Sequence, residues 1–267
     1  MFVTIRFSFT IYHYLLILNF WYWATWPLLP VLAAQGVWTR RRTPRLPDAA
    51  GPQSGFAGSS LSLLSPSSLN LVVLGESTVA GIGAPDHETA LTGQAARALS
   101  QHTGRPVNWH AVGLSGATAA TARAQLLPRL AGLRADVCIV ALGVNDVIKL
   151  RSPARWQRDL TALLNGVRAV LGPVPLILAS APPLEKFPAL PEPLRTVFGA
   201  RAARLNRVGA GLSAALPQVV CVPFSRLPAP DEFAPDGFHP GPAAYAVWGA
   251  QLGAEAAKIV TKRSAEC

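Results

Sequence analysis

The amino-acid sequence predicts an α/β fold: a three-layer α/β/α sandwich on a mostly parallel five-stranded sheet, with a membrane helix added at the N-terminus. Three observations predict it. Short apolar runs alternate about five times with longer helical patterns, which is typical of parallel strands joined by helical crossovers. Polar clusters follow several of these runs. The first 38 residues are strongly apolar and carry a single charge, Arg6.

Residues 1–38 are predicted to form a transmembrane anchor. No Asp, Glu, Lys or Arg occurs between Phe7 and Trp38. Phe7–Trp26 alone reaches the length of about 20 residues that a helix needs to span a bilayer. Aromatic side chains crowd the far end of this stretch, as in an interfacial belt (Trp21, Tyr22, Trp23 and Trp26). Pro27 and Pro30 are expected to kink or end the helix.

A cleaved signal peptide is the competing interpretation, because Val31-Leu-Ala33 resembles a cleavage site. However, only Arg6 precedes the apolar stretch, which far exceeds the roughly 7–15 residues of a usual signal core. Four arginines follow closely, and positive charge there opposes translocation (Arg40, Arg41, Arg42 and Arg45). We therefore expect an uncleaved anchor with the domain in the cytoplasm, and keep export to the periplasm as the alternative.

The remaining chain divides into a linker and one domain. Residues 39–69 are basic, rich in Pro, Ser and Gly, and without hydrophobic period, which predicts a linker. The folded domain is expected over residues 70–267. Its strands are predicted at Leu71–Leu74, Val107–Val112, Asp136–Leu142, Leu176–Ala179 and Val219–Val222. Its helices are predicted at Glu88–Gln101, Thr118–Leu133, Pro153–Leu171, Leu190–Leu216 and Pro242–Val260.

Local signals support these elements. Leu71–Leu74 is fully apolar and ends at Gly75, which suits a strand buried on both faces. Ser152 is a typical cap for the helix that has Pro153 at its first position. Tyr245 and Trp248 begin an apolar stripe on the last helix.

Composition argues against several other classes. The net charge is +10, but most arginines of the domain are scattered singly with few interleaved aromatics, so we expect no nucleic-acid partner. The three cysteines form neither a disulfide framework nor a metal-ligand spacing. No metal and no cofactor is predicted, and the oligomeric state stays open.

Four polar clusters carry the functional signal. They are Gly75-Glu-Ser-Thr78, Gly113-Leu-Ser-Gly-Ala-Thr118, Gly143-Val-Asn-Asp146 and Asp236-Gly-Phe-His-Pro240. Three follow predicted strands and the fourth precedes the last helix. Singly, each has an ordinary explanation, such as a helix cap at Ser77 or a turn at Gly113. Sites in parallel α/β folds form at the carboxyl ends of strands, so together they predict one site.

The order of these clusters resembles the SGNH, or GDSL-type, hydrolase family, over about Leu71 to His239. The first motif of that family reads Gly-Asp-Ser, whereas this chain has Glu76 before Ser77. A Walker loop and a Gly-x-Ser-x-Gly elbow are both excluded, the first by Ala80 and the second by Val79. The resemblance implies a flavodoxin-like arrangement of the sheet and ester hydrolysis.

The resemblance also implies residue roles. Ser77 is the expected nucleophile, His239 its base and Asp236 the group that orients the imidazole. The backbone amides of Ser77 and Gly116 and the side-chain amide of Asn145 are the implied oxyanion donors. Asp146 is expected to hold the Asn145 loop, and Gly113 to be a turn residue. Pro182, Pro183, Leu184, Phe187 and Leu190 are candidates for an apolar wall near the site, or for an ordinary core loop.

The expected function is a membrane-tethered serine esterase or lipase acting on a small-molecule or lipid ester. Acyl transfer to another acceptor and thioester cleavage use the same three residues and stay open. A catalytically silent, membrane-tethered binding module is the alternative from another class, and Glu76 is its only support in the sequence.

Overall fold

The computed structural model describes residues 28–58, 68–226 and 228–266. Six strands form one sheet in the order β1-β3-β2-β4-β5-β6. The five predicted parallel strands are confirmed as β2 (Leu69–Gly75), β3 (Val107–Gly113), β4 (Val137–Ala141), β5 (Leu176–Ala179) and β6 (Val219–Val222). The sixth, β1 (Ser54–Ala57), pairs antiparallel with β3, so the prediction of five strands was wrong by one edge strand.

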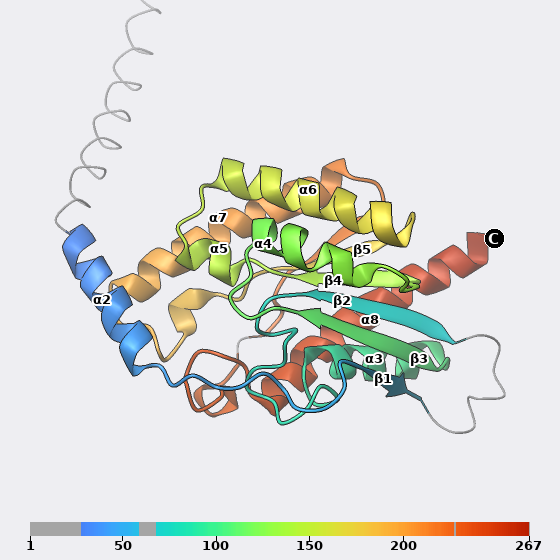
Figure 1. Cartoon of the computed structure of the whole chain (residues 1–267), viewed down its shortest axis with the longest axis horizontal. Helices are drawn as coiled ribbons and strands as arrows, with labels where there is room; N and C mark the ends of the chain where they lie inside the picture. Colours follow the sequence, from blue (N-terminus) through green and yellow to red (C-terminus); the bar gives the residue numbers. More distant parts are fainter. Residues whose placement is uncertain (1–27, 59–67, 227, 267) are drawn as a thin grey trace, which may run out of the picture.

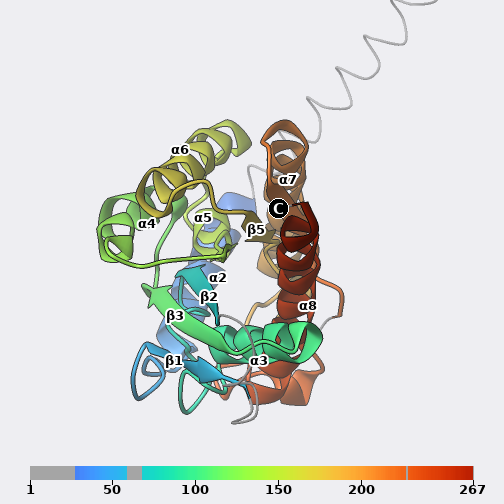
Figure 2. The same ribbon diagram turned by 90° about the vertical axis from the view of Figure 1, so that its right-hand side faces the viewer.

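Helices cover both faces of the sheet (Figure 1). One face carries α3 (Leu91–Thr103) and α8 (Pro242–Glu266). The other carries α4 (Ala119–Gln125), α5 (Val144–Ile148), α6 (Pro153–Leu171) and α7 (Leu194–Ala215). Short 3-10 turns complete the chain at η2 (Leu127–Leu130), η3 (Leu184–Lys186) and η4 (Pro230–Glu232). The three-layer sandwich is therefore confirmed, and Figure 2 shows the layers from the side.

Alternation along the strands builds two cores. Leu71 and Val73 of β2 pack toward α3 and α8, whereas Val72 and Leu74 pack toward α6 and α7. All four are fully buried, as expected of a strand covered on both faces. Ser152 caps α6 by accepting from the amide of Arg155, as predicted.

The segment predicted as a linker is partly ordered on the domain. Besides β1, helix α2 (Leu28–Arg42) extends into it through Arg42. Within the predicted linker, the amide of Ala49 donates to the carbonyl of Ala80 at 3.0 Å, and Gln53 Oε1 accepts from Arg129 Nη2 at 2.8 Å. The absence of hydrophobic period misled the prediction because these contacts are polar and distant in sequence.

The predicted membrane span Phe7–Trp26 lies outside the described residues. Among the residues that are described, no helix is both long and apolar enough to cross a membrane. The anchor and the cytoplasmic location thus stay predictions.

The strand order locates the site. The chain passes from β2 to β3 on one side and then returns to β4 on the other side of β2. Ligands bind at such a switch point, beyond the carboxyl ends of the strands. Gly75, the last residue of β2, pairs there with Gly113 of β3 and Ala141 of β4.

Candidate active site

Ser77 stands in a tight turn directly after β2. The carbonyl of Glu76 accepts from the amides of Val79 and Ala80, both at 3.0 Å, and this closes the turn. Gly75 is required at its start, because a Cβ there would lie 2.2 Å from the carbonyl oxygen of Ala141. The turn directs Ser77 out of the sheet while keeping it largely buried, at 8% exposure.

Ser77, His239 and Asp236 form one hydrogen-bonded chain. His239 Nε2 lies 3.0 Å from the Ser77 hydroxyl, and His239 Nδ1 lies 2.6 Å from Asp236 Oδ2. With Nδ1–H donating to the carboxylate, Nε2 is free to accept the Ser77 proton. The three predicted residues are therefore brought together across 162 positions of sequence.

Asp236 is held as a carboxylate by its surroundings. Burial alone would raise its pKa, but the His239 ring and the amides of His239 and Phe238 donate to it and together lower the pKa. Oδ1 accepts the two backbone bonds, each at 2.9 Å, which leaves Oδ2 for the imidazole. The carboxylate thus fixes both the loop and the ring orientation.

The loop that carries His239 is tied to the segment after Ser77. The Tyr245 hydroxyl on α8 donates to the carbonyl of Ile82 at 2.6 Å in a buried environment. Gly83 lies so close to Pro240 that a Cβ would approach its carbonyl oxygen to 2.3 Å. These contacts set the spacing between the serine turn and the histidine loop.

Glu76, beside the candidate nucleophile, is buried and faces the turn after β4. Its carboxylate accepts from the amide of Val144 at 3.1 Å, and from the amide and side-chain amide of Asn145 at 3.0 and 2.5 Å. Burial raises its pKa to about 7, against these three hydrogen bonds. Glu76 thereby orients the Asn145 side chain and leaves one of its two amide hydrogens for another acceptor.

The expected oxyanion donors sit at the ends of three adjacent strands, after β2, β3 and β4. Within the described ranges, the amides of Ser77 and Gly116 donate to no other group. Gly116 is exposed, has a φ of +77° and has no atom within 4 Å of a Cβ position. The structure brings these residues to the carboxyl end of the parallel strands, and their role stays a prediction.

Two supporting roles differ from expectation. Gly113 is not a turn residue; it ends β3, where a Cβ would lie 2.3 Å from the amide nitrogen of Ala80. Asp146 does not bond the Asn145 turn through its side chain. Its Oδ2 accepts from the amide of Ala119 at 3.0 Å and so joins α5 to the start of α4. Burial raises the pKa of Asp146 to about 6.

An apolar cavity of about 30 Å³ opens beside Ser77 and His239. Phe187 packs edge-on against Phe233 and Phe238, with ring centroids 5.3 and 5.2 Å apart. Pro182 and Phe187 line it as the sequence suggested, whereas Leu184 and Leu190 belong to the buried core. Sequence reasoning missed Phe233, Phe238 and Trp248, although Phe238 lies between Asp236 and His239.

This geometry agrees with comparison to known proteins. The family model described as GDSL-like lipase/acylhydrolase matches residues 73–247, more than half of the chain. The chain belongs to the GDSL-like lipase/acylhydrolase family. In this family member, Glu76 stands where the family motif Gly-Asp-Ser has aspartate, so a carboxylate is kept beside the serine.

Individual relatives extend over much of the domain. A GDSL-like esterase of Mycobacterium tuberculosis is 27% identical over 190 residues, which are 68% of this chain and 60% of that protein. This GDSL-like chain therefore matches less than two thirds of that relative's length. Among solved structures, TesA superposes with a TM-score of 0.57 at 22% identity, over 72% of this chain and 99% of that one. An aryl esterase of M. smegmatis gives 0.55 at 19%, over 73% and 99%. These two likenesses support the fold.

Proposed function

We propose that this chain hydrolyses carboxylic esters with Ser77 as the nucleophile. The single observation that carries the proposal is the hydrogen-bonded chain from Ser77 through His239 to the buried Asp236. A serine hydroxyl is a weak nucleophile until a base accepts its proton. Family membership and the esterase named among the relatives support the same chemistry.

The mechanism follows from the contacts. His239 Nε2 takes the Ser77 proton as Oγ attacks the ester carbonyl, and Asp236 stabilises the imidazolium that forms. The carbonyl oxygen becomes an oxyanion, which accepts from the amides of Ser77 and Gly116 and from Asn145 Nδ2. His239 then returns the proton to the leaving alcohol, and water releases the acyl group from Ser77 by the same steps.

The test is turnover of a short-chain aryl ester by wild type and by Ser77→Ala. The variant should lose at least about 10³-fold in kcat while its circular dichroism spectrum stays unchanged. Undiminished turnover by the variant would refute the assignment.

Acyl transfer is tested by adding a competing alcohol to the same assay, because a transferase yields the new ester in excess over free acid. A thioester substrate tests the thioesterase alternative in the same assay.

The small aromatic cavity favours short acyl groups. Its volume of about 30 Å³ and its aromatic lining support a preference for acyl groups as small as acetyl over longer chains. We expect 4-nitrophenyl acetate to exceed 4-nitrophenyl octanoate in kcat/KM. Phe187→Ala should narrow that difference by enlarging the cavity, and the reverse order of the two esters in wild type would contradict this selectivity.

Membrane tethering is the second part of the proposal. It is supported by the uncharged stretch Phe7–Trp26 and by the arginines that end α2. The full chain expressed in bacteria should stay in the membrane pellet after carbonate extraction. Its domain should resist protease added outside the inner membrane if it faces the cytoplasm. Release into the carbonate supernatant would overturn the anchor, and digestion from outside would favour the exported alternative.

A further inference from the structure

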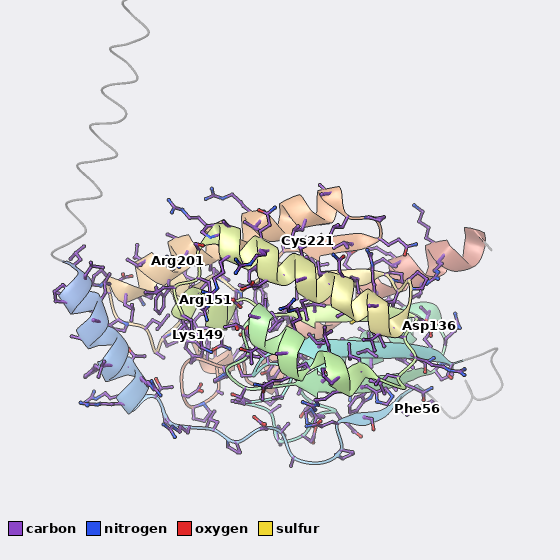
Figure 3. All side chains as sticks on the ribbon, turned by 45° about the horizontal axis from the view of Figure 1, so that its top comes forward. Phe56, Asp136, Lys149, Arg151, Arg201 and Cys221 are labelled. Atoms are coloured by element: carbon purple, nitrogen blue, oxygen red, sulfur yellow. The ribbon has the colours of Figure 1, made fainter. Side chains whose placement is uncertain are left out.

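Three cationic side chains gather beside the proposed oxyanion site. Lys149 directly follows α5, Arg151 lies two residues later, and Arg201 comes from α7. Figure 3 shows the three labelled close together near the ends of α5, α6 and α7. Arg201 Nη2 donates to the carbonyl oxygen of Arg151 at 2.9 Å, which fixes the two arginines against each other. We refer to these three residues as the cationic cluster.

No acidic side chain forms an ion pair with this cluster within the described ranges. None of its three cationic groups has a carboxylate oxygen within 4.0 Å there. The Nε atoms of Arg151 and Arg201 are buried and have no hydrogen-bond partner in this part of the chain. Burial, followed by the nearby charge of Arg204, lowers the pKa of Arg201. The two arginines are half-buried and Lys149 is exposed, so an anion could reach the cluster and pair with the buried Nε groups.

The nearest acids are engaged elsewhere. Asp146 feels the charges of Arg151 and Lys149, but it is buried and accepts from the amide of Ala119. Asp159 pairs with Arg155 and Arg158 on α6. The cluster therefore keeps a net positive charge.

The cluster is joined directly to the proposed oxyanion site. Lys149 Nζ donates to the carbonyl oxygen of Gly116 at 2.9 Å, and the Lys149 amide donates to the carbonyl of Asn145 at 2.9 Å. None of the cluster's residues lines the aromatic cavity beside Ser77. A substrate that places its acyl group in that cavity leaves its alcohol part outside it. Lys149 is the member of the cluster that contacts the backbone of Gly116 and Asn145.

We propose that Lys149, Arg151 and Arg201 bind an anionic group, a carboxylate or a phosphate, on the alcohol part of the ester substrate. This inference rests on the proposed ester hydrolysis at Ser77. Guanidinium groups suit it because their planar donors match both oxyanions. The cluster thus selects short-chain esters of negatively charged alcohols.

Three aryl acetates of similar shape test the selection. 4-Acetoxybenzoate and 4-acetoxyphenyl phosphate carry an anion on the alcohol part, and methyl 4-acetoxybenzoate is neutral. Wild type should give a higher kcat/KM for both anionic esters than for the methyl ester. Arg151→Gln and Arg201→Gln should each lower the anionic-to-neutral ratio about tenfold, since a hydrogen bond to a charged group is worth about that factor.

Arg134→Gln is the matched control. Arg134 is exposed and precedes β4, at the opposite end of the sheet from the site, so its removal should leave the ratio unchanged. Should the cluster variants fail to fold, inorganic phosphate supplies a test on wild type. It should raise KM for 4-acetoxybenzoate more than for the methyl ester, and more than sodium chloride does at equal ionic strength.

Equal kcat/KM for the anionic and neutral esters in wild type, or an unchanged ratio in both cluster variants, would overturn the inference. Failure of the proposed function is recognised separately, with the neutral methyl ester. If wild type hydrolyses the methyl ester and Ser77→Ala does not, the proposed function holds even where the inference about the cluster fails. Sedimentation with phosphatidylglycerol vesicles distinguishes a lipid headgroup as the source of the anion. If Arg151→Gln lost vesicle binding while its ester ratio stayed unchanged, the cluster would be a membrane contact and not a substrate site.

Discussion

Glu76 accepts hydrogen bonds from both the backbone amide and the side-chain amide of Asn145, at 3.0 and 2.5 Å. The two residues are 69 positions apart, and the contact links the turn after β2 to the turn after β4. The longer acidic side chain before Ser77 therefore has a specific partner. It positions the amide proposed to stabilise the oxyanion, which removes the main support for a silent binding module.

Replacement of Glu76 should impair kcat more than KM. Glu76→Gln replaces one carboxylate oxygen with an –NH2 group, which cannot accept. That group is then forced against either the amide of Val144 or the two donors of Asn145, and the turn that carries Asn145 is displaced. We expect kcat to fall on the order of 10²-fold, comparable with loss of one oxyanion donor. Glu76→Asp keeps a carboxylate and should lose less than Glu76→Gln. Steady-state kinetics on an aryl acetate decides this, and equal kcat for wild type and Glu76→Gln would exclude the positioning role.

Glu76 should also make stability depend on pH. Burial raises its pKa from 4.5 to about 7, so between these values the folded chain binds more protons than the unfolded chain. The contribution of Glu76 to the free energy of unfolding therefore falls as pH rises from about 4.5 to 7, by up to about 3 kcal/mol. Denaturant unfolding of wild type and Glu76→Gln at pH 5 and pH 8 measures it. Between pH 5 and pH 8, wild type should lose unfolding free energy relative to Glu76→Gln. A difference between the two proteins that is the same at both pH values would contradict the expectation.

Asp236→Asn should remove activity without unfolding the loop. An asparagine oxygen can still accept from the amides of Phe238 and His239, which Asp236 Oδ1 now binds. The imidazole loses its charged partner and its fixed tautomer, so kcat should fall by about 10³-fold or more. Turnover together with thermal unfolding checks both parts. Retention of a tenth of wild-type kcat would show that the carboxylate is dispensable.

Comparison of Gly83→Ala with Gly104→Ala distinguishes backbone strain from displacement of the histidine loop, because both glycines have a positive φ. Gly83 has φ +93°, and an added Cβ would meet the Pro240 carbonyl at 2.3 Å; Gly104 has φ +67° and open space. Both alanine variants should lose about 1 kcal/mol of stability through strain. Only Gly83→Ala should also displace Pro240 and hence His239, with a clear loss of kcat. Equal kcat in the two variants would show that this contact does not position the base.

Much of the fold follows from local pattern. The five parallel strands were predictable because each is a short apolar run with a helical segment after it. β1 was not, because Ser-Gly-Phe-Ala carries no apolar period and gains its order by pairing with β3, some 50 residues later. The short helix α5 and the extent of α2 depend likewise on contacts made in the folded chain.

The candidate site divides in the same way. Ser77, Asp236 and His239 were predictable because their motifs are short and keep a known order. The partner of Glu76, the aromatic cavity and the cationic cluster arise from elements far apart in sequence. Gly113 shows the limit most simply: the residue was noted, but its reason is the approach of the Ala80 backbone and not a turn.

The most direct test of the account is the site of covalent labelling by a fluorophosphonate, which phosphonylates only an activated serine. Wild type should carry one adduct, and peptide mass spectrometry should place it on Ser77. His239→Ala should label at a rate lower by at least about 10²-fold, because Oγ would lack its base. Labelling at another serine, or unchanged labelling of Ser77 without His239, would contradict the central claim that His239 activates Ser77.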